Sequence, residues 1–332
     1  MHDGSDCYAS HNMEFASLVY RQCLTSGGKR RTAWSLVRMA LIRLFKDPTC
    51  SLPIHGRCMR LPLSHALPSY LQQFPSYDRL PHRISEYIHR EYGHLSCIDV
   101  GANVGDTIAA FYEKDTDTFL AVEPNPRFNK LLVENWGWNR NVTIVADICS
   151  SGSSEGFFVI EERNGTASIL ETENGIQMRR RQLDEIVDDN PSATNANVLK
   201  IDTDGHDFAV VAGSKRLLAR NLPAILFECD VFKNTNYVED CLGTLNILKQ
   251  SGYSSFLLYD NIGHLMGRYS LSDLSPFLNL LFFQLISDFR YFDILAMRDE
   301  DMLPFYTAEI KYFADQIPDR SLRRTALSAS GL

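Results

Sequence analysis

The alternation of short apolar runs with helix-like segments from Leu95 onward most limits what this chain can fold into. Runs such as 95–100 (LSCIDV) are apolar almost throughout, as expected of parallel strands buried on both faces. The segments between the runs have the period of helices. Repeated strand–helix–strand units predict an α/β fold with an open, doubly wound sheet built from right-handed crossovers.

The expected elements follow this alternation through most of the chain. We expect strands at 95–100, 118–124, 141–148, 156–162, 196–202, 223–230, 253–261 and 291–299. We expect helices at 107–114, 126–139, 179–189, 207–221 and 238–252. The simplest division is an N-terminal extension (1–94), one catalytic domain (95–300) and a C-terminal helix and tail (301–332).

Within the extension, we expect residues 1–13 to be disordered and 34–45 (WSLVRMALIRLF) to form an amphipathic helix. The turn-rich stretch 47–80 predicts a short hairpin followed by a loop. A further helix over 80–92 would end at Gly93, a typical helix C-cap.

The net charge of −8 is unevenly distributed: residues 1–96 hold 12 Lys and Arg against 7 Asp and Glu, so the remainder carries −13. An acidic main body disfavours a nucleic-acid partner, because that affinity depends on clustered cations. Residues 15–46 contain no acid and seven basic residues. This segment is read either as a peripheral membrane contact or as a docked helix with arginine stems on its solvent face.

The 8 cysteines show no C-x-x-C pair and no zinc spacing, which fits a reducing compartment. The first residues lack the basic start and apolar stretch of a secretory signal. No apolar run reaches the about 18 residues that suggest a membrane span. We therefore expect a cytoplasmic protein.

The first strand–loop–helix of the domain, 97–111 (CIDVGANVGDTIAAF), is the expected ligand site, because such sheets bind ligands beyond the carboxyl ends of their strands. Gly101 and Gly105 bracket the turn, but Asn103 stands where a dinucleotide fingerprint would have its second glycine. The carboxylates of Asp99 and Asp106 flank the loop and would repel a pyrophosphate. They suit a ligand that carries positive charge.

The next two strands end in acids as well. Glu123 follows the glycine loop by about 20 residues, where an acid can accept from both ribose hydroxyls. Asp147 could accept from an adenine amino group while the Ile148 backbone contacts the ring. Taken alone, each acid could be a helix cap or a solvated loop residue. Together they predict a ligand with an ammonium group, a ribose and an adenine, which are combined in S-adenosylmethionine (SAM).

The stretch 199–208 (LKIDTDGHDF) supplies a second loop at the same sheet edge. Asp202 ends the strand, while Asp204 and Asp207 have helix capping as their alternative role. His206 could act as a general base, since its unperturbed pKa is about 6.5. The string also resembles the D-x-D-G of haloacid-dehalogenase phosphatases and the D-x-D of glycosyltransferases, but both strings are short and common.

A second interpretation of the acids at this edge of the sheet is a site for a divalent metal ion. Asp202 with Glu228 and Asp230, which lie on one face of the next strand, could hold Mg²⁺. Hydrogen bonding to substrate or support of the loop is the preferred role of these acids. No resident metal is therefore expected.

The series CIDVGANVGDT, VEPNP, VLKIDTDGHD and PAILFECD resembles the FkbM family of SAM-dependent methyltransferases, and the resemblance covers about residues 50–235. The resemblance implies a class I, Rossmann-like methyltransferase sheet and O-methylation of a hydroxyl acceptor. It implies that Asp99, Gly101, Asn103 and Gly105 line the methionine end, with Glu123 on the ribose and Asp147 on the adenine. Ser168 matches loosely a serine near the cleft.

The chain departs from the family pattern in the second loop. Aspartates stand at 204 and 207 where glutamate is usual, and His206 replaces a residue that is more often small or apolar. We expect Asp202 to orient the acceptor or take its proton, with His206 as the alternative. We expect 47–93 and the hairpin 253–270 to cover the cleft and select a small-molecule or glycan acceptor.

Two rivals remain from other classes. A nicotinamide (NAD(P)) reductase would share the sheet and Glu123, although Asn103 counts against it. A SAM-binding protein without turnover would keep the loop but have a blocked acceptor pocket.

Overall fold

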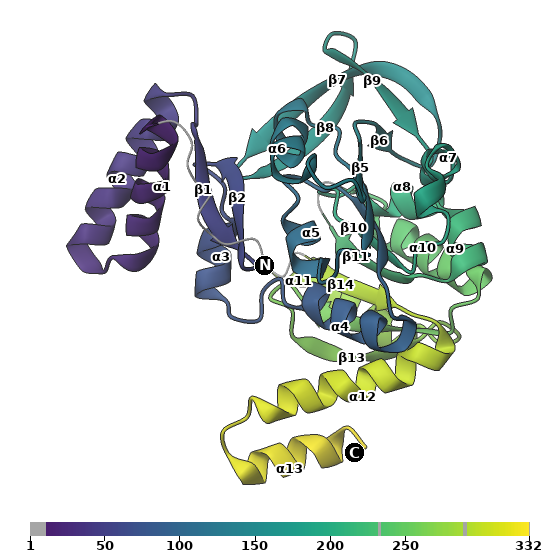
Figure 1. The fold of residues 1–332 in the computed structure, drawn as a ribbon. Coiled ribbons are helices and arrows are strands. Elements are labelled where there is room, and N and C mark those ends of the chain that lie inside the picture. Colours follow the sequence, from purple (N-terminus) through teal and green to yellow (C-terminus); the bar gives the residue numbers. More distant parts are fainter. Residues whose placement is uncertain (1–10, 232–233, 288–290, 332) are drawn as a thin grey trace.

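An eight-stranded sheet lies at the centre of the computed structural model, which describes residues 11–231, 234–287 and 291–331 (Figure 1). The strand order is β13-β12-β14-β11-β10-β3-β4-β5. In chain order the strands are β3 (Ser96–Val100), β4 (Thr118–Val122), β5 (Val142–Val145), β10 (Val198–Ile201), β11 (Ala224–Asp230), β12 (Ser255–Asp260), β13 (Leu265–Ser270) and β14 (Tyr291–Ala296).

The chain reverses its direction of winding between β3 and β10. From β3 it runs outward through β4 and β5, and it then returns to β10 and β11 on the other side, all in parallel. β14 inserts antiparallel between β11 and β12. The predicted doubly wound α/β sheet is confirmed, and its switch point places a crevice beyond the carboxyl ends of β3 and β10.

Helices cover both faces of this sheet, and the buried side chains form one cluster on each face. One face carries α4 (Leu80–Tyr92), α5 (Asp106–Phe111), α6 (Pro126–Trp136) and α12 (Asp299–Asp315). The other carries α7 (Leu183–Asp189), the 3₁₀ turn η1 (Pro191–Ala193), α8 (Asp207–Ala212), α9 (Lys215–Asn221), α10 (Tyr237–Ser251) and α11 (Ser275–Ile286).

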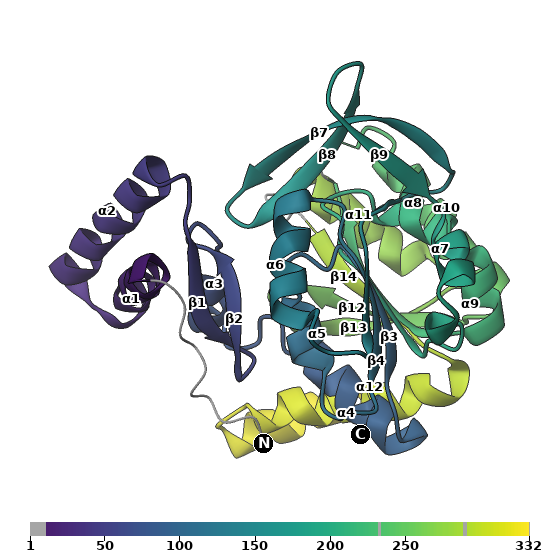
Figure 2. The same cartoon turned by 45° about the horizontal axis from the view of Figure 1, so that its top comes forward.

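A second sheet of four strands lies over the carboxyl edge of the first (Figure 2). Its order is β6 (Ile148–Cys149), β9 (Ile176–Arg181), β7 (Ser154–Arg163) and β8 (Thr166–Thr172). Only the strand at 156–162 was expected here. The helix predicted over 179–189 is wrong at its start, since Arg179–Arg181 belong to β9 and the helix begins at Leu183.

The extension contains two antiparallel helices and a hairpin. They are α1 (His11–Thr25), α2 (Gly28–Leu44), β1 (Thr49–Ile54) and β2 (Arg57–Pro62), followed by α3 (Leu67–Gln73). The hairpin and the Gly93 cap of α4, with φ +79°, are confirmed. Of the expected disorder at 1–13, residues 1–10 lie outside the described residues, and 11–13 instead begin α1.

The predicted helix over 34–45 forms the larger part of α2. Arg38 does not lie on the solvent face, because its guanidinium lies 3.8 Å from the centre of the Tyr20 ring and donates to the Leu63 carbonyl at 2.8 Å. Arg127 of α6 also joins the extension to the domain through Asp47, at 2.8 Å. At the other end of the chain, α13 (Arg320–Ala329) follows α12.

Candidate functional site

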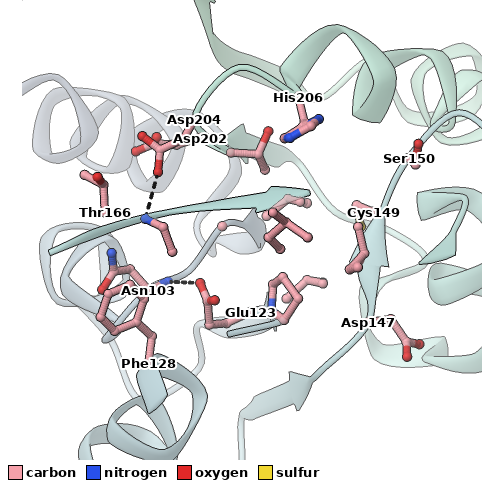
Figure 3. A pocket seen from close by; sticks show the side chains of 18 of the residues that line it. Asn103, Glu123, Phe128, Asp147, Cys149, Ser150, Thr166, Asp202, Asp204 and His206 are labelled. Carbon is pink, nitrogen blue, oxygen red and sulfur yellow. Dashed lines mark hydrogen bonds between the residues drawn. The ribbon is translucent and has the colours of Figure 1, made fainter. Parts of the chain in front are cut away.

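A cavity of about 310 Å³ lies where β3, β4 and β10 end, enclosed from above by residues of the second sheet (Figure 3). Its volume is at the lower end of the range of small-molecule sites, about 300–1,000 Å³. The predicted site residues that line it are Gly101, Asn103, Asp106, Glu123, Asp147, Ile148, Asp202, Asp204 and His206. Two chain segments far apart in sequence therefore meet in one cavity, as the strand ends predicted.

Asp99, Gly105 and Ser168 are absent from this lining. Asp99 lies behind it with a fully buried carboxylate, and Gly105 packs against Trp136, whose Nε1–H donates to the Gly105 carbonyl at 2.9 Å. Ser168 is also outside, whereas its neighbours Ala167 and Ile169 line the cavity. Asp99 and Gly105 therefore support the loop from behind.

Gly101 allows the two loops of the site to touch. Its φ is +80°, and a Cβ built there would lie only 1.8 Å from the Asp202 carbonyl oxygen. No side chain fits at that distance, and the conformation is one that glycine adopts without strain. Asn103 takes the left-handed region too, with φ +49°, which is uncommon for a residue with a side chain.

Glu123 is held by backbone amides of both flanking loops. Its Oε2 accepts from Asn103 N and its Oε1 from Asn125 N, each at 2.8 Å. The residue is 5% exposed, and burial raises the pKa of its carboxyl to about 7. Each oxygen keeps a second lone pair, so the carboxylate can still accept from a ligand in the cavity.

Lys200 is a site residue that the sequence reasoning missed. Its Nζ lies 3.0 Å from Asp202 Oδ2 and 3.6 Å from Asp99 Oδ1, and it also lines the cavity. Burial alone would lower the pKa of Lys200, but the carboxylates of Asp202, Asp99 and Asp106 outweigh it and raise the pKa. A lysine inside the otherwise apolar strand VLKI was the signal that pointed to such a partner.

Buried acids surround this ammonium. Burial raises the pKa of Asp99 to about 6, against the lowering effect of Lys200, and raises the pKa of Asp106 to about 7. Within the described part of the chain, neither carboxylate oxygen of Asp99 accepts a hydrogen bond. The inner wall of the cavity is therefore rich in carboxyl groups with a single buried lysine among them.

The acids of the second loop fall into two groups. Asp204 and Asp207 accept hydrogen bonds from backbone amides, whereas Asp202 is partly exposed. Asp207 Oδ2 accepts from Thr203 N and Oγ1, at 3.2 and 3.0 Å, so this residue supports the loop before α8 rather than capping the helix amides. Asp204, at φ +49°, accepts from Ala167 N at 3.2 Å and so joins the loop to β8. Burial raises the pKa of Asp204 to about 7, with Asp202 adding to the shift.

His206 precedes the first residue of α8 without capping it through its side chain. Partial desolvation of the imidazole by its neighbours, with nearby Arg180, lowers its pKa below the usual value, although the residue as a whole is exposed. The ring is thus neutral near neutral pH and able to accept a proton. In Figure 3 it is drawn on the same side of the cavity as Asp202 and Asp204.

Asp147 departs from its expected geometry. Its carboxylate pairs with Arg179, at 3.0 and 3.1 Å, and with Arg181 at 3.5 Å. Figure 3 shows this carboxylate pointing away from the other labelled side chains. Asp147 therefore contributes to the wall while its acceptor oxygens are turned to β9.

The predicted cover does not line this cavity. None of the residues at 47–93 or 253–270 lines the cavity; Thr166, Ala167 and Ile169 of β8, with Phe158 of β7, do so instead. The extension packs against the turn between β7 and β8, where a Cβ on Gly165 would lie 2.6 Å from the His65 ring. The Gly165 carbonyl in that turn accepts from Asn103 Nδ2 at 2.7 Å, which connects the turn to the first loop of the cavity. The extension thus supports the β7–β8 turn.

The second-choice metal set is not assembled. Within the described residues, no group of three or more His, Cys, Asp or Glu side chains is placed to hold a metal ion, and this includes Asp202, Glu228 and Asp230. Among the same residues, no helix is long and apolar enough to cross a membrane.

Comparison with known families bears directly on this cavity, because residues 99–255 match the Methyltransferase FkbM domain. Over this range the chain has the sequence pattern of an FkbM methyltransferase domain. The match includes both loops of the cavity, Glu123 and Lys200. The resemblance read from the motifs is confirmed, and the central sheet is that of a class I methyltransferase.

Solved structures similar to the chain include methyltransferases. The methyltransferase FkbM from Methylobacillus flagellatus is 11% identical with a TM-score of 0.38, and the match covers 86% of this chain and 60% of that one. This chain thus spans about three fifths of its length. No curated protein sequence matches the chain.

Two further similar structures have comparable scores. A SAM-dependent O-methyltransferase from Thermotoga maritima is 14% identical, covers 65% of each chain and has a TM-score of 0.34. A fibrillarin from Aeropyrum pernix, solved with bound S-adenosyl-L-methionine, is 13% identical, covers 61% of this chain and 66% of its own, and has a TM-score of 0.35.

Proposed function

We propose that this domain transfers a methyl group from SAM to a hydroxyl of a sugar, glycan or secondary-metabolite acceptor. The observation that carries the proposal is one cavity that joins the Gly101–Glu123 side to the Asp202 side. We also propose, from the sequence alone, that it works in the cytoplasm.

The residues present fit SAM chemically. The carboxyl group of Asp106, which lines the cavity, suits a ligand with an ammonium and a sulfonium, and Glu123 retains lone pairs for the two ribose hydroxyls. Val122, Ile148 and Phe158 supply apolar surface for a flat ring. Asp147 would serve the adenine through its backbone neighbours, unless its pair with Arg179 opens.

SAM bound here would supply an electrophilic methyl group, and the chain would supply position and a proton acceptor. Alignment of two reactants is worth about 7–11 kcal/mol, and a positioned base about 10²–10⁴-fold. Asp202 Oδ2 is oriented by Lys200, and the side chain is 43% exposed, so Oδ1 is available to take the proton of an acceptor hydroxyl. His206, neutral and in the same loop, is the alternative acceptor of that proton.

The test is a calorimetric titration of the purified protein with S-adenosylhomocysteine (SAH), with NAD as the parallel ligand. We expect micromolar binding of SAH that Glu123→Ala weakens by at least about tenfold, the cost of about one charged hydrogen bond. Glu161→Ala, which removes an exposed glutamate of β7, is the matched control and should bind as the wild type does.

Binding of NAD without SAH would contradict the proposal and favour a reductase. Binding of neither ligand by a demonstrably folded sample would leave a scaffold without cofactor. After SAH binding, a screen of hydroxyl acceptors with labelled SAM distinguishes an enzyme from a SAM-binding protein without turnover.

A further inference from the structure

The helical hairpin α1–α2 leaves an outer surface that nothing in the described chain covers. Figure 1 shows the pair on the side of the molecule away from the central sheet, with β1 and β2 between them. None of the 17 residues of α2 is buried. Leu36, Leu44 and Phe45 at its outer side are 58%, 76% and 64% exposed, and Val37 and Met39 are also exposed.

These side chains are arranged by the helix period. Positions 33, 36, 37, 40 and 44 fall on one face of α2, and all are apolar (Ala, Leu, Val, Ala, Leu). The opposite face carries Trp34, Arg38 and Leu41, which are half-buried toward the rest of the protein. α2 therefore has a second apolar face that lies in solvent, besides the side that packs on the protein.

Cations surround this face. Lys29, Arg30 and Arg43 of α2, with Lys46 just beyond, are exposed, and no acid occurs from Phe15 to Lys46. Apart from Glu14 in the first turn of α1, neither helix contains an acid that could neutralise them. The rest of the chain, after residue 96, carries −13.

We propose that the α1–α2 hairpin docks on an anionic membrane surface, with the apolar face of α2 at the level of the lipid headgroups. Apolar contact plus attraction of Lys and Arg to anionic lipid is the binding mode of interfacial helices. A second copy of the chain is a poorer occupant, because two such faces would bring cations of like sign together. The acidic body would be repelled, which leaves one orientation.

The hairpin is fixed firmly enough to orient the domain. Arg38 Nε donates to the Leu63 carbonyl at 2.8 Å and its NH2 group to the His65 carbonyl at 3.2 Å. His65 in turn packs against the β7–β8 turn that encloses the cavity. A docked α2 would thus hold the cavity at a set distance from the lipid.

The test is flotation of the full chain with vesicles of phosphatidylcholine alone or mixed with phosphatidylserine, at low and high salt. We expect binding to the mixed vesicles only, reduced by salt. Lys29→Glu with Arg30→Glu should weaken it at least about tenfold, since each cation near such a surface contributes about fivefold. Lys130→Glu with Arg140→Glu, exposed cations of the domain, is the charge control and should bind normally.

Leu36→Gln with Leu44→Gln tests the apolar part, with the exposed Leu303→Gln and Leu322→Gln of α12 and α13 as control. The first pair should weaken flotation and the second should not. SAH binding should be unchanged in all variants, so a failure here is distinct from a failure of the proposed methyltransferase. Equal binding to both vesicle types, no binding, or a dimer abolished by the Leu36 and Leu44 changes would overturn the proposal.

Discussion

The two loops of the cavity are built alike but hold their acids differently. Each follows a central parallel strand, passes through a non-glycine residue in the left-handed region (Asn103 or Asp204) and ends at a helix start. Beside the first loop, the carboxylates are buried: Asp99 of β3 is fully buried, and Glu123, just after the neighbouring strand β4, already accepts two backbone amides. In the second, Asp202 is 43% exposed and has one hydrogen bond, from Lys200.

We interpret this difference as a division between carboxylates that bind the cofactor and a carboxylate that takes part in the reaction. A carboxylate fixed by backbone amides is pre-organised and presents its remaining lone pairs in set directions, as cofactor recognition requires. A carboxylate with solvent access can take up and release a proton during turnover. With the proposed function, the same strand–loop–helix device would serve two purposes within one cavity, and the loops are joined where Gly101 meets the Asp202 carbonyl.

The largest effect is expected from breaking that contact. Gly101→Ala places a Cβ against the Asp202 carbonyl in a backbone conformation that alanine rarely adopts, so the unfolding free energy should fall by about 3 kcal/mol or more. Chemical denaturation measures it. Gly152→Ala, where no atom lies within 4 Å, should change stability by less than about 0.5 kcal/mol. Equal behaviour of the two variants would show that the loops need not touch.

The second-largest effect is expected on methyl transfer and not on cofactor binding. Asp202→Asn should reduce methyl transfer by about 10²–10⁴-fold while SAH affinity is retained, because the first loop is untouched. Turnover and calorimetry on the same sample separate the two. If Asp202→Asn turns over normally and His206→Gln does not, the proton goes to the imidazole and the assignment of Asp202 is wrong.

The third-largest effect tests the Lys200 ammonium, which lies beside both Asp99 and Asp202. Lys200→Gln leaves the carboxyls of Asp99 and Asp106 uncompensated, so at about pH 8 the unfolding free energy should fall by about 3 kcal/mol. Their raised pKa values, about 6 and about 7, mean that the folded state binds protons that the unfolded state releases. Lowering the pH through these values therefore favours the folded state, and the loss should be smaller at about pH 5.

A second substitution, which removes a negative charge, provides a control for the Lys200→Gln variant. Adding Asp99→Asn to Lys200→Gln removes one of the buried carboxyls, so stability at about pH 8 should partly return. Denaturation at both pH values measures the interaction. A loss that is equal at the two pH values, or that Asp99→Asn deepens, would show that Lys200 acts by packing rather than by charge.

The features of the fold that depend on short stretches of sequence were predictable. The strand ends that deliver Glu123 and Asp202, and the glycines that turn the first loop, depend on short apolar runs followed by turn residues. The order of the strands in the sheet then follows from right-handed crossovers. This reasoning placed nine expected residues in one cavity without any contact being known.

Features set by contacts between distant segments were missed. Arg179–Arg181 read as a helix start, but they form a strand because β9 pairs with β7 and Arg179 with Asp147. The helix expected over 207–221 breaks at Gly213, where a Cβ would lie 2.1 Å from the Ser150 carbonyl. β8, which lines the cavity, was missed for the same reason: it is half polar, and only its pairing with β7 makes it a strand.

The smallest effect sharpens the comparison through pH alone. Because the pKa of Glu123 in the free protein is about 7, its carboxyl must lose a proton to accept from a ligand hydroxyl, so SAH affinity should rise by about tenfold from about pH 6 to about pH 8. Asp99, Asp106 and Asp204 titrate nearby, so the measure is the difference between wild type and Glu123→Gln. Gln binds SAH more weakly and should remove most of that rise. If the rise survives in Glu123→Gln but disappears in Asp106→Asn, the titrating group is at the ammonium end of the first loop and Glu123 binds in its neutral form.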